Sequence, residues 1–134
     1  MSEGTMAATI LVVDDEQDVR TYLRTLFAKA GYTVETAEDG EAGLTQAKAT
    51  RPDLIFLDIM MPKRTGIMLY RRLKKDDDLA KVPVIILTGL AQYRSFFAQD
   101  FEQVPHPEEF VEKPPKQEHL LELAKKYAPL EADG

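Results

Sequence analysis

Short runs of strand-forming residues alternate with amphipathic segments along the chain, and this alternation constrains the fold more than any other feature. The runs are residues 9–13, 33–37, 54–57, 84–87 and 110–111. The third and fourth runs are apolar at successive positions, which is typical of strands covered on both faces. Strands that alternate with helices build parallel sheets. The sequence therefore predicts an α/β fold with a five-stranded parallel sheet.

Apolar residues that follow these runs recur at the spacing of a helix face. After the first run, the recurring residues are Val19, Tyr22, Leu23, Leu26, Phe27 and Ala30. Gly31 then gives a helix-stop signal. The other helices are predicted at 41–49, 66–75, 93–101 and 120–127. We expect one domain over residues 9–128, with an N-terminal extension at 1–8 and a C-terminal tail at 129–134.

Composition narrows the possible functions. The 134 residues include no cysteine and only two histidines, so thiolate sites are excluded and a zinc enzyme is disfavoured. The 17 Lys and Arg residues against 23 Asp and Glu residues give a net charge of −6, which opposes direct binding to nucleic acid. No apolar run is long enough to span a bilayer, and the first residues lack the pattern of a secretion signal. We therefore expect a cytoplasmic protein without a membrane contact.

Residues that can do chemistry follow the predicted strands. Asp14 and Asp15 follow the first run, Asp58 the third, Thr88 the fourth and Lys113 the fifth. Because the carboxyl ends of parallel strands lie at one edge of the sheet, we expect these side chains to converge. Three close carboxylates favour a divalent cation with oxygen ligands, and Mg²⁺ fits best. A carboxylate nucleophile with a metal ion and a lysine is suited to phosphoryl transfer.

Four strings of residues give this pattern a specific resemblance. LVVDDE, LIFLDIMMP, IILTG and FVEKPP occur in this order, each at the end of a predicted strand. Together they resemble the receiver domains of two-component response regulators, over residues 9–127. The resemblance implies a flavodoxin-like (βα)5 doubly wound sandwich with strand order 2-1-3-4-5. It also implies a signalling domain rather than an enzyme, although such a domain assists its own phosphorylation and dephosphorylation.

The same resemblance gives roles to the acidic residues. It implies that Asp58 is the phosphoacceptor and takes the phosphoryl group from a phosphohistidine of a histidine kinase or phosphotransfer protein. It implies that Asp15, Asp58 and the backbone carbonyl of Met60 bind Mg²⁺ directly, while Asp14 acts mainly through water.

A switch and an output surface are implied as well. Lys113 would pair with the phosphoryl group, Thr88 would hydrogen-bond to it, and Phe110 would turn inward together with Thr88. The bond between Lys113 and Pro114 resembles the family's cis peptide bond. The output surface would combine the last predicted strand with the helices before and after it, and would contact a downstream protein or a second copy of the chain.

The sequence departs from the family pattern before the last strand. Receivers commonly have small residues there, whereas residues 100–109 read DFEQVPHPEE. We therefore expect an unusual connection into that strand. The aromatic residues of the preceding segment, 93–101, are interpreted as the buried face of an ordinary helix rather than as a docking patch.

Other interpretations fit parts of the pattern. A small phosphohydrolase could use Asp58 as its nucleophile, but Met60 stands where a second aspartate is expected. A flavin or nucleotide binder needs a glycine-rich loop after the first strand, and Asp14 and Asp15 would repel phosphate there. A receiver-like interaction module without phosphorylation is a further alternative, although the full set of site residues argues against it. Taken singly, Asp14 or Asp15 could cap a helix, and Phe110 could be a core residue.

Overall fold

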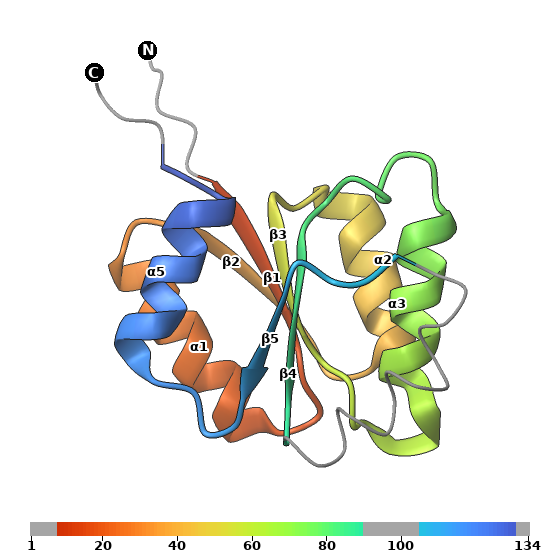
Figure 1. Cartoon of the computed structure of the whole chain (residues 1–134), viewed down its shortest axis with the longest axis horizontal. Helices are drawn as coiled ribbons and strands as arrows, with labels where there is room; N and C mark the ends of the chain where they lie inside the picture. The colour runs from red at the N-terminus through yellow and green to blue at the C-terminus, as the bar shows by residue number, and fades with distance from the viewer. Residues whose placement is uncertain (1–7, 90–104, 131–134) are drawn as a thin grey trace.

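The computed structural model describes residues 8–89 and 105–130, which form a five-stranded parallel sheet with helices on both faces (Figure 1). The strands are β1 (Thr9–Val13), β2 (Thr33–Ala37), β3 (Leu54–Asp58), β4 (Val84–Thr88) and β5 (Glu109–Glu112). They lie in the order β2-β1-β3-β4-β5, and each neighbouring pair is parallel. The predicted fold class and strand order are confirmed.

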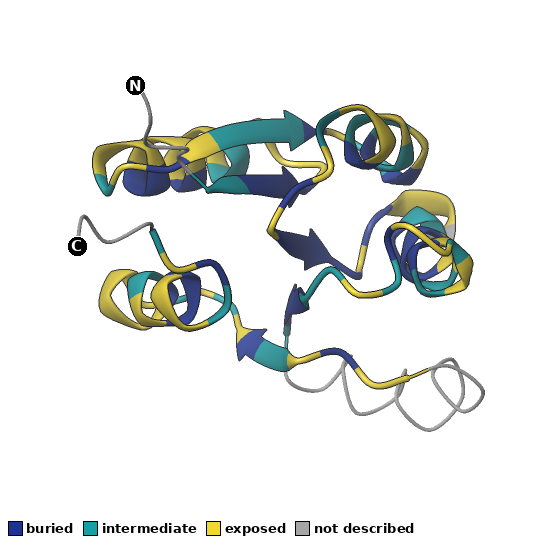
Figure 2. Cartoon of the chain, turned by 90° about the horizontal axis from the view of Figure 1, so that it is seen from above, coloured by how far each residue is buried: buried dark blue, intermediate teal, exposed yellow. Residues whose placement is uncertain are grey.

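The helices form two layers. α1 (Gln17–Lys29) and α5 (Gln117–Tyr127) cover one face of the sheet, and α2 (Gly40–Thr50) and α3 (Thr65–Lys75) cover the other (Figures 1 and 2). Every residue of β3 and β4 is buried between these layers, as their apolar runs predict. The helix predicted at 93–101 lies outside the described residues. Within the described ranges, no helix is long and apolar enough to cross a membrane.

An apolar stripe packs α1 against the sheet. Leu23 and Phe27 are buried in the core on this face, and the Phe27 ring stacks on Phe56 of β3 with 4.9 Å between ring centroids. Tyr22 is 45 % exposed, although its spacing groups it with the buried residues. Tyr22 therefore lies at the edge of the apolar stripe rather than in the core. The helix ends before Gly31, whose φ of +105° favours glycine.

Glycine residues let α3 approach the backbone of its neighbours. A Cβ atom at Gly66 would lie 2.5 Å from the carbonyl oxygen of Asp58, and one at Gly40 in α2 would overlap the backbone of Thr65. A short 3₁₀ turn, η1 (Pro62–Arg64), leads from the loop after β3 into α3. The first turn of α3 therefore packs directly on the residue that ends β3.

Side chains hold β5 in place at the edge of the sheet. Within the described residues β5 pairs with β4 alone. Just before β5, Glu108 donates its N–H to the carbonyl of Val84 at 3.0 Å, and its carboxylate Oε1 accepts the N–H of Val84 at 2.7 Å. The hydroxyl of Tyr70 in α3 donates to the carbonyl of Pro105. The described part of the unusual connection, residues 105–108, is thus attached to both β4 and α3.

Candidate functional site

Three carboxylates meet at the carboxyl ends of β1 and β3, at the lower end of the sheet in Figure 1. One oxygen atom from each of Asp14, Asp15 and Asp58 lies within 4.8 Å of the others. Asp14 and Asp58 are buried, with exposed fractions of 0 % and 3 %, whereas Asp15 is exposed. Carboxylate oxygens at this spacing can bind a single hard cation. The structure thus brings together the three acidic residues that the sequence placed at one edge.

Backbone N–H groups orient the two buried carboxylates. Oδ1 of Asp58 accepts the N–H of Met60 at 2.9 Å, and Oδ1 of Asp14 accepts the N–H of Glu16 at 2.9 Å. Asp14 therefore closes a tight turn before α1, whose N-cap residue is Glu16 and has no side-chain cap bond. Asp14 therefore does not act as the N-cap of α1. These hydrogen bonds leave the second oxygen of each buried carboxylate for other partners.

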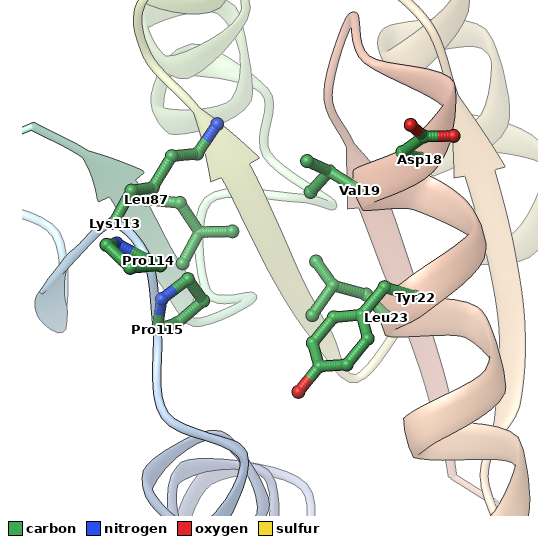
Figure 3. A pocket seen from close by; sticks show the side chains of 8 residues that line it. All are labelled: Asp18, Val19, Tyr22, Leu23, Leu87, Lys113, Pro114 and Pro115. Atoms are coloured by element: carbon green, nitrogen blue, oxygen red, sulfur yellow. The ribbon is translucent and has the colours of Figure 1, made fainter.

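Lys113 contacts both of these second oxygens. Its Nζ lies 3.0 Å from Oδ2 of Asp14 and 3.4 Å from Oδ2 of Asp58. In Figure 3 the Lys113 side chain extends from the loop after β5 toward the end of β3, away from Pro114 and Pro115. The Lys113–Pro114 peptide bond is cis, as the resemblance predicts. One ammonium group therefore offsets part of the repulsion between two buried carboxylates.

The charges of this cluster shift two pKa values. Burial, and then the charge of Asp14, raise the pKa of Asp58 from 3.8 to about 6, although Lys113 and the N–H of Met60 lower it. Burial lowers the pKa of Lys113, but the charges of Asp58 and Asp14 outweigh burial and hold that pKa above its ordinary value. At neutral pH the lysine is charged, and Asp58 is ionised at a cost in folding free energy. A further cation beside Asp58 would remove this cost.

Thr88 ends β4, one position beyond the residue that is in register with Asp58. Its side chain is buried, with 2 % of the residue exposed, and its Oγ1 has no hydrogen-bond partner among the described residues. A buried hydroxyl without a partner costs about 1–3 kcal/mol, so such a group requires an explanation. An acceptor that binds at the strand ends would supply the missing hydrogen bond.

Phe110 lies in β5, in register with Ile86 of β4. Because side chains alternate along a strand, Phe110, Ile86 and Thr88 face the same side of the sheet. The Phe110 ring is half-buried and packs on the core between the sheet and the layer of α2 and α3. The two residues that the resemblance pairs as a switch therefore share one face.

A hollow beside Lys113 was not found by sequence reasoning. It lies between α1 and the loop after β5 and has a volume of about 520 Å³ (Figure 3). Its lining residues are Asp18, Val19, Tyr22, Leu23, Leu87, Lys113, Pro114 and Pro115. Tyr22 and Pro115 stand on opposite sides of it. The available signal was Tyr22, an aromatic residue within the apolar stripe of α1, but helical spacing does not show how far such a residue is covered.

The fold and the site define a doubly wound α/β protein with an acidic site at the carboxyl ends of its parallel strands. The family model of the response regulator receiver domain matches residues 10–125. The chain belongs to this family, the receiver domains of two-component response regulators, which are signalling proteins that interact with histidine kinases and downstream effectors.

Individual relatives agree with this assignment. Protein Rrf1 of Nitratidesulfovibrio vulgaris is 37 % identical over 86 residues, which are 64 % of this chain and 62 % of Rrf1. The response regulator MprA of Mycobacterium ulcerans is 42 % identical over 84 residues, which are 63 % of this chain and 35 % of MprA. The match therefore spans less than two thirds of Rrf1 and about a third of MprA.

Solved structures match over more of the chain. The chemotaxis response regulator CheY4 of Vibrio cholerae has a TM-score of 0.79 and 29 % identity, covering 91 % of this chain and 99 % of CheY4. The receiver domain of a signal transduction histidine kinase from Syntrophus aciditrophicus has a TM-score of 0.79 and 33 % identity, covering 90 % of this chain and 89 % of that domain. The similarity thus extends over nearly the whole of these two structures.

Proposed function

We propose that Asp58 accepts a phosphoryl group and that this event switches a protein-binding surface of the domain. The observation that carries the proposal is the surroundings of the Asp58 carboxylate. It is buried at a strand end, lies in a cluster with two other carboxylates, and has the ammonium of Lys113 at 3.4 Å. A carboxylate in such a setting can act as a nucleophile that forms an acyl phosphate.

Mg²⁺ is the cation we propose for the acidic cluster. All side-chain donors there are carboxylate oxygens, which Mg²⁺ prefers, and the chain has no cysteine for a softer metal. Asp15, Asp58 and the carbonyl of Met60 would hold the ion, and Asp14 would act through water. The raised pKa of Asp58 supports a cation at this position, because a positive charge would remove the cost of ionisation. When bound, Mg²⁺ neutralises charge on the transferring phosphoryl group.

The proposed donor is a phosphohistidine of a histidine kinase or phosphotransfer protein. An oxygen of the Asp58 carboxylate attacks the phosphorus atom, the P–N bond breaks, and the departing imidazole takes up a proton from solvent. The ammonium of Lys113 offsets negative charge on the phosphoryl oxygens, and the unpartnered Oγ1 of Thr88 donates a hydrogen bond to one of them. Each of these groups thus gains a partner when the acyl phosphate forms.

Output is proposed to leave through the surface of β5 and α5, together with the helix predicted at 93–101. As the Thr88 hydroxyl moves toward the phosphoryl group, it vacates space into which the half-buried ring of Phe110 turns. The attachment of Glu108 to Val84 restrains the backbone at the start of β5, so we expect a small rearrangement centred on Phe110. A downstream protein or a second copy of the chain would read this change.

This proposal describes a cytoplasmic signalling domain over residues 9–128 rather than an enzyme that turns over a substrate. A phosphohydrolase has less support, because the residue two positions after Asp58 is Met60, which offers no acid or base. An interaction module that is never phosphorylated has less support as well, because it would leave the buried hydroxyl of Thr88 without a hydrogen-bond acceptor.

Intact-mass spectrometry after incubation with acetyl phosphate and Mg²⁺ tests the proposal. We expect wild type to gain one phosphoryl group, Asp58→Asn to gain none, and the control Asp77→Asn, in an exposed loop, to react like wild type. EDTA should abolish the gain. A wild-type protein that stays unmodified with Mg²⁺, or one that is modified equally well in EDTA, would contradict the proposal.

A further inference from the structure

A second hollow, separate from the acidic cluster, lies between α1 and β2. It has a volume of about 220 Å³ and is lined by Gln17, Arg20, Thr21, Arg24 and Thr36. At 3.6 residues per turn, the four α1 residues lie on the flank of the helix opposite to Tyr22 and the hollow beside Lys113. Each of the five lining side chains can donate hydrogen bonds, and none of them is acidic.

The two arginines are oriented by the chain but not neutralised by it. Nη1 of Arg20 donates to the carbonyl of Asp14 at 2.7 Å, and Nη2 of Arg24 donates to Oγ1 of Thr36 at 3.1 Å. In the part of the chain that the structure describes, neither guanidinium forms an ion pair with a carboxylate. Two positive charges one helical turn apart repel each other, and no carboxylate of the described chain lies within ion-pair distance of either guanidinium.

The number of hydrogen-bond donors around the hollow determines which kind of anion fits it best. A guanidinium has five N–H donors, and the described chain uses one from each arginine. A carboxylate has two oxygens and is satisfied by a single guanidinium fork. A phosphate group has more oxygens, so it can accept from both forks and from the neighbouring hydroxyls at once. We propose that this hollow is a binding site for a phosphate group, either inorganic phosphate or a phosphomonoester, distinct from the site of Asp58.

Arg20 connects this site to the acidic cluster. Its guanidinium holds the carbonyl of Asp14, and the Asp14 side chain contacts Lys113 at 3.0 Å. A phosphate group that engages Arg20 therefore changes the charge and the hydrogen bonding next to Asp14. Occupancy of the hollow should be detectable at the backbone of Asp14 as well as at the arginines.

Titration of the whole chain with sodium phosphate, followed by nitrogen-15 NMR in EDTA at pH 7.5, tests the proposal. We expect saturable shifts of the Arg20 and Arg24 side-chain Nε–Hε signals and of the Thr36 amide. Sodium chloride at matched ionic strength should not reproduce them. Arg24→Gln should weaken the apparent affinity at least tenfold. Arg51→Gln, which removes an exposed guanidinium that pairs with Asp78 at 3.7 Å, is the matched control and should bind like wild type.

A second arm uses glycerol 2-phosphate as a phosphomonoester. Binding at least tenfold tighter than that of inorganic phosphate identifies an esterified ligand, and equal binding identifies the free ion. Shifts that do not saturate, that sodium chloride reproduces, or that persist unchanged in Arg24→Gln overturn the proposal. The titration needs neither Mg²⁺ nor a reactive carboxylate, so repeating it with Asp58→Asn separates its outcome from that of the proposed phosphorylation.

Discussion

Replacement of Asp58 by asparagine should stabilise the metal-free protein at neutral pH. Burial first, and the charge of Asp14 second, raise the pKa of Asp58 from 3.8 to about 6 in the folded protein. The folded state therefore binds this proton more tightly than the unfolded chain, so stability falls as the pH rises from about 4 to about 6. At 1.36 kcal/mol for each pKa unit, the lost stability above that interval is about 3 kcal/mol. Asparagine keeps an acceptor for the N–H of Met60 without the charge.

Urea denaturation in EDTA, at pH 7.5 and at pH 4, measures this difference. We expect Asp58→Asn to gain up to about 3 kcal/mol over wild type at pH 7.5 and little at pH 4, where the wild-type carboxyl is already protonated. Asp77→Asn, in an exposed loop, should change neither value. Equal stability of Asp58→Asn and wild type at pH 7.5, or a gain of the same size at pH 4, would refute the electrostatic argument.

Three further predictions concern the neighbours of Asp58. Lys113→Ala leaves Asp14 buried without its cation, so urea denaturation should show a loss of roughly 3 kcal/mol; an unchanged midpoint would mean that water replaces the ammonium. Thr88→Val removes a buried hydroxyl that has no partner in the described chain, so metal-free stability should rise by about 1 kcal/mol. The same variant should lose the β5 chemical-shift changes that beryllofluoride, a stand-in for the phosphoryl group, causes in wild type. Gly66→Ala brings a Cβ to within 2.5 Å of the Asp58 carbonyl and should cost about 1–3 kcal/mol in thermal unfolding, unless α3 can shift away.

The sheet and its acidic edge could be predicted because both follow from local pattern. A run of apolar residues marks each central strand, and the residue after it lies at the carboxyl edge whatever the detailed packing. Lys113 and Asp14 are 99 positions apart in the chain. Their convergence could be predicted because both residues follow strands. The strand pattern does not specify which oxygens the ammonium faces. The exposure of Tyr22 was missed because helical spacing defines a stripe but not how far the neighbouring loop covers its edge. The hollow between α1 and β2 was missed for a similar reason, since its arginines lie on two turns of a polar flank that spacing treats as solvated.

The hydrogen bond between the Val84 N–H and the Glu108 carboxylate has an evolutionary consequence. A backbone carbonyl is present whichever residue occupies a position, whereas a carboxylate can be gained or lost in one substitution. Val84 begins β4, and the acidic cluster lies at the other end of the strands. A substitution at Glu108 alone can therefore weaken or restore the attachment of β5 to β4, while the residues around Asp58 stay the same.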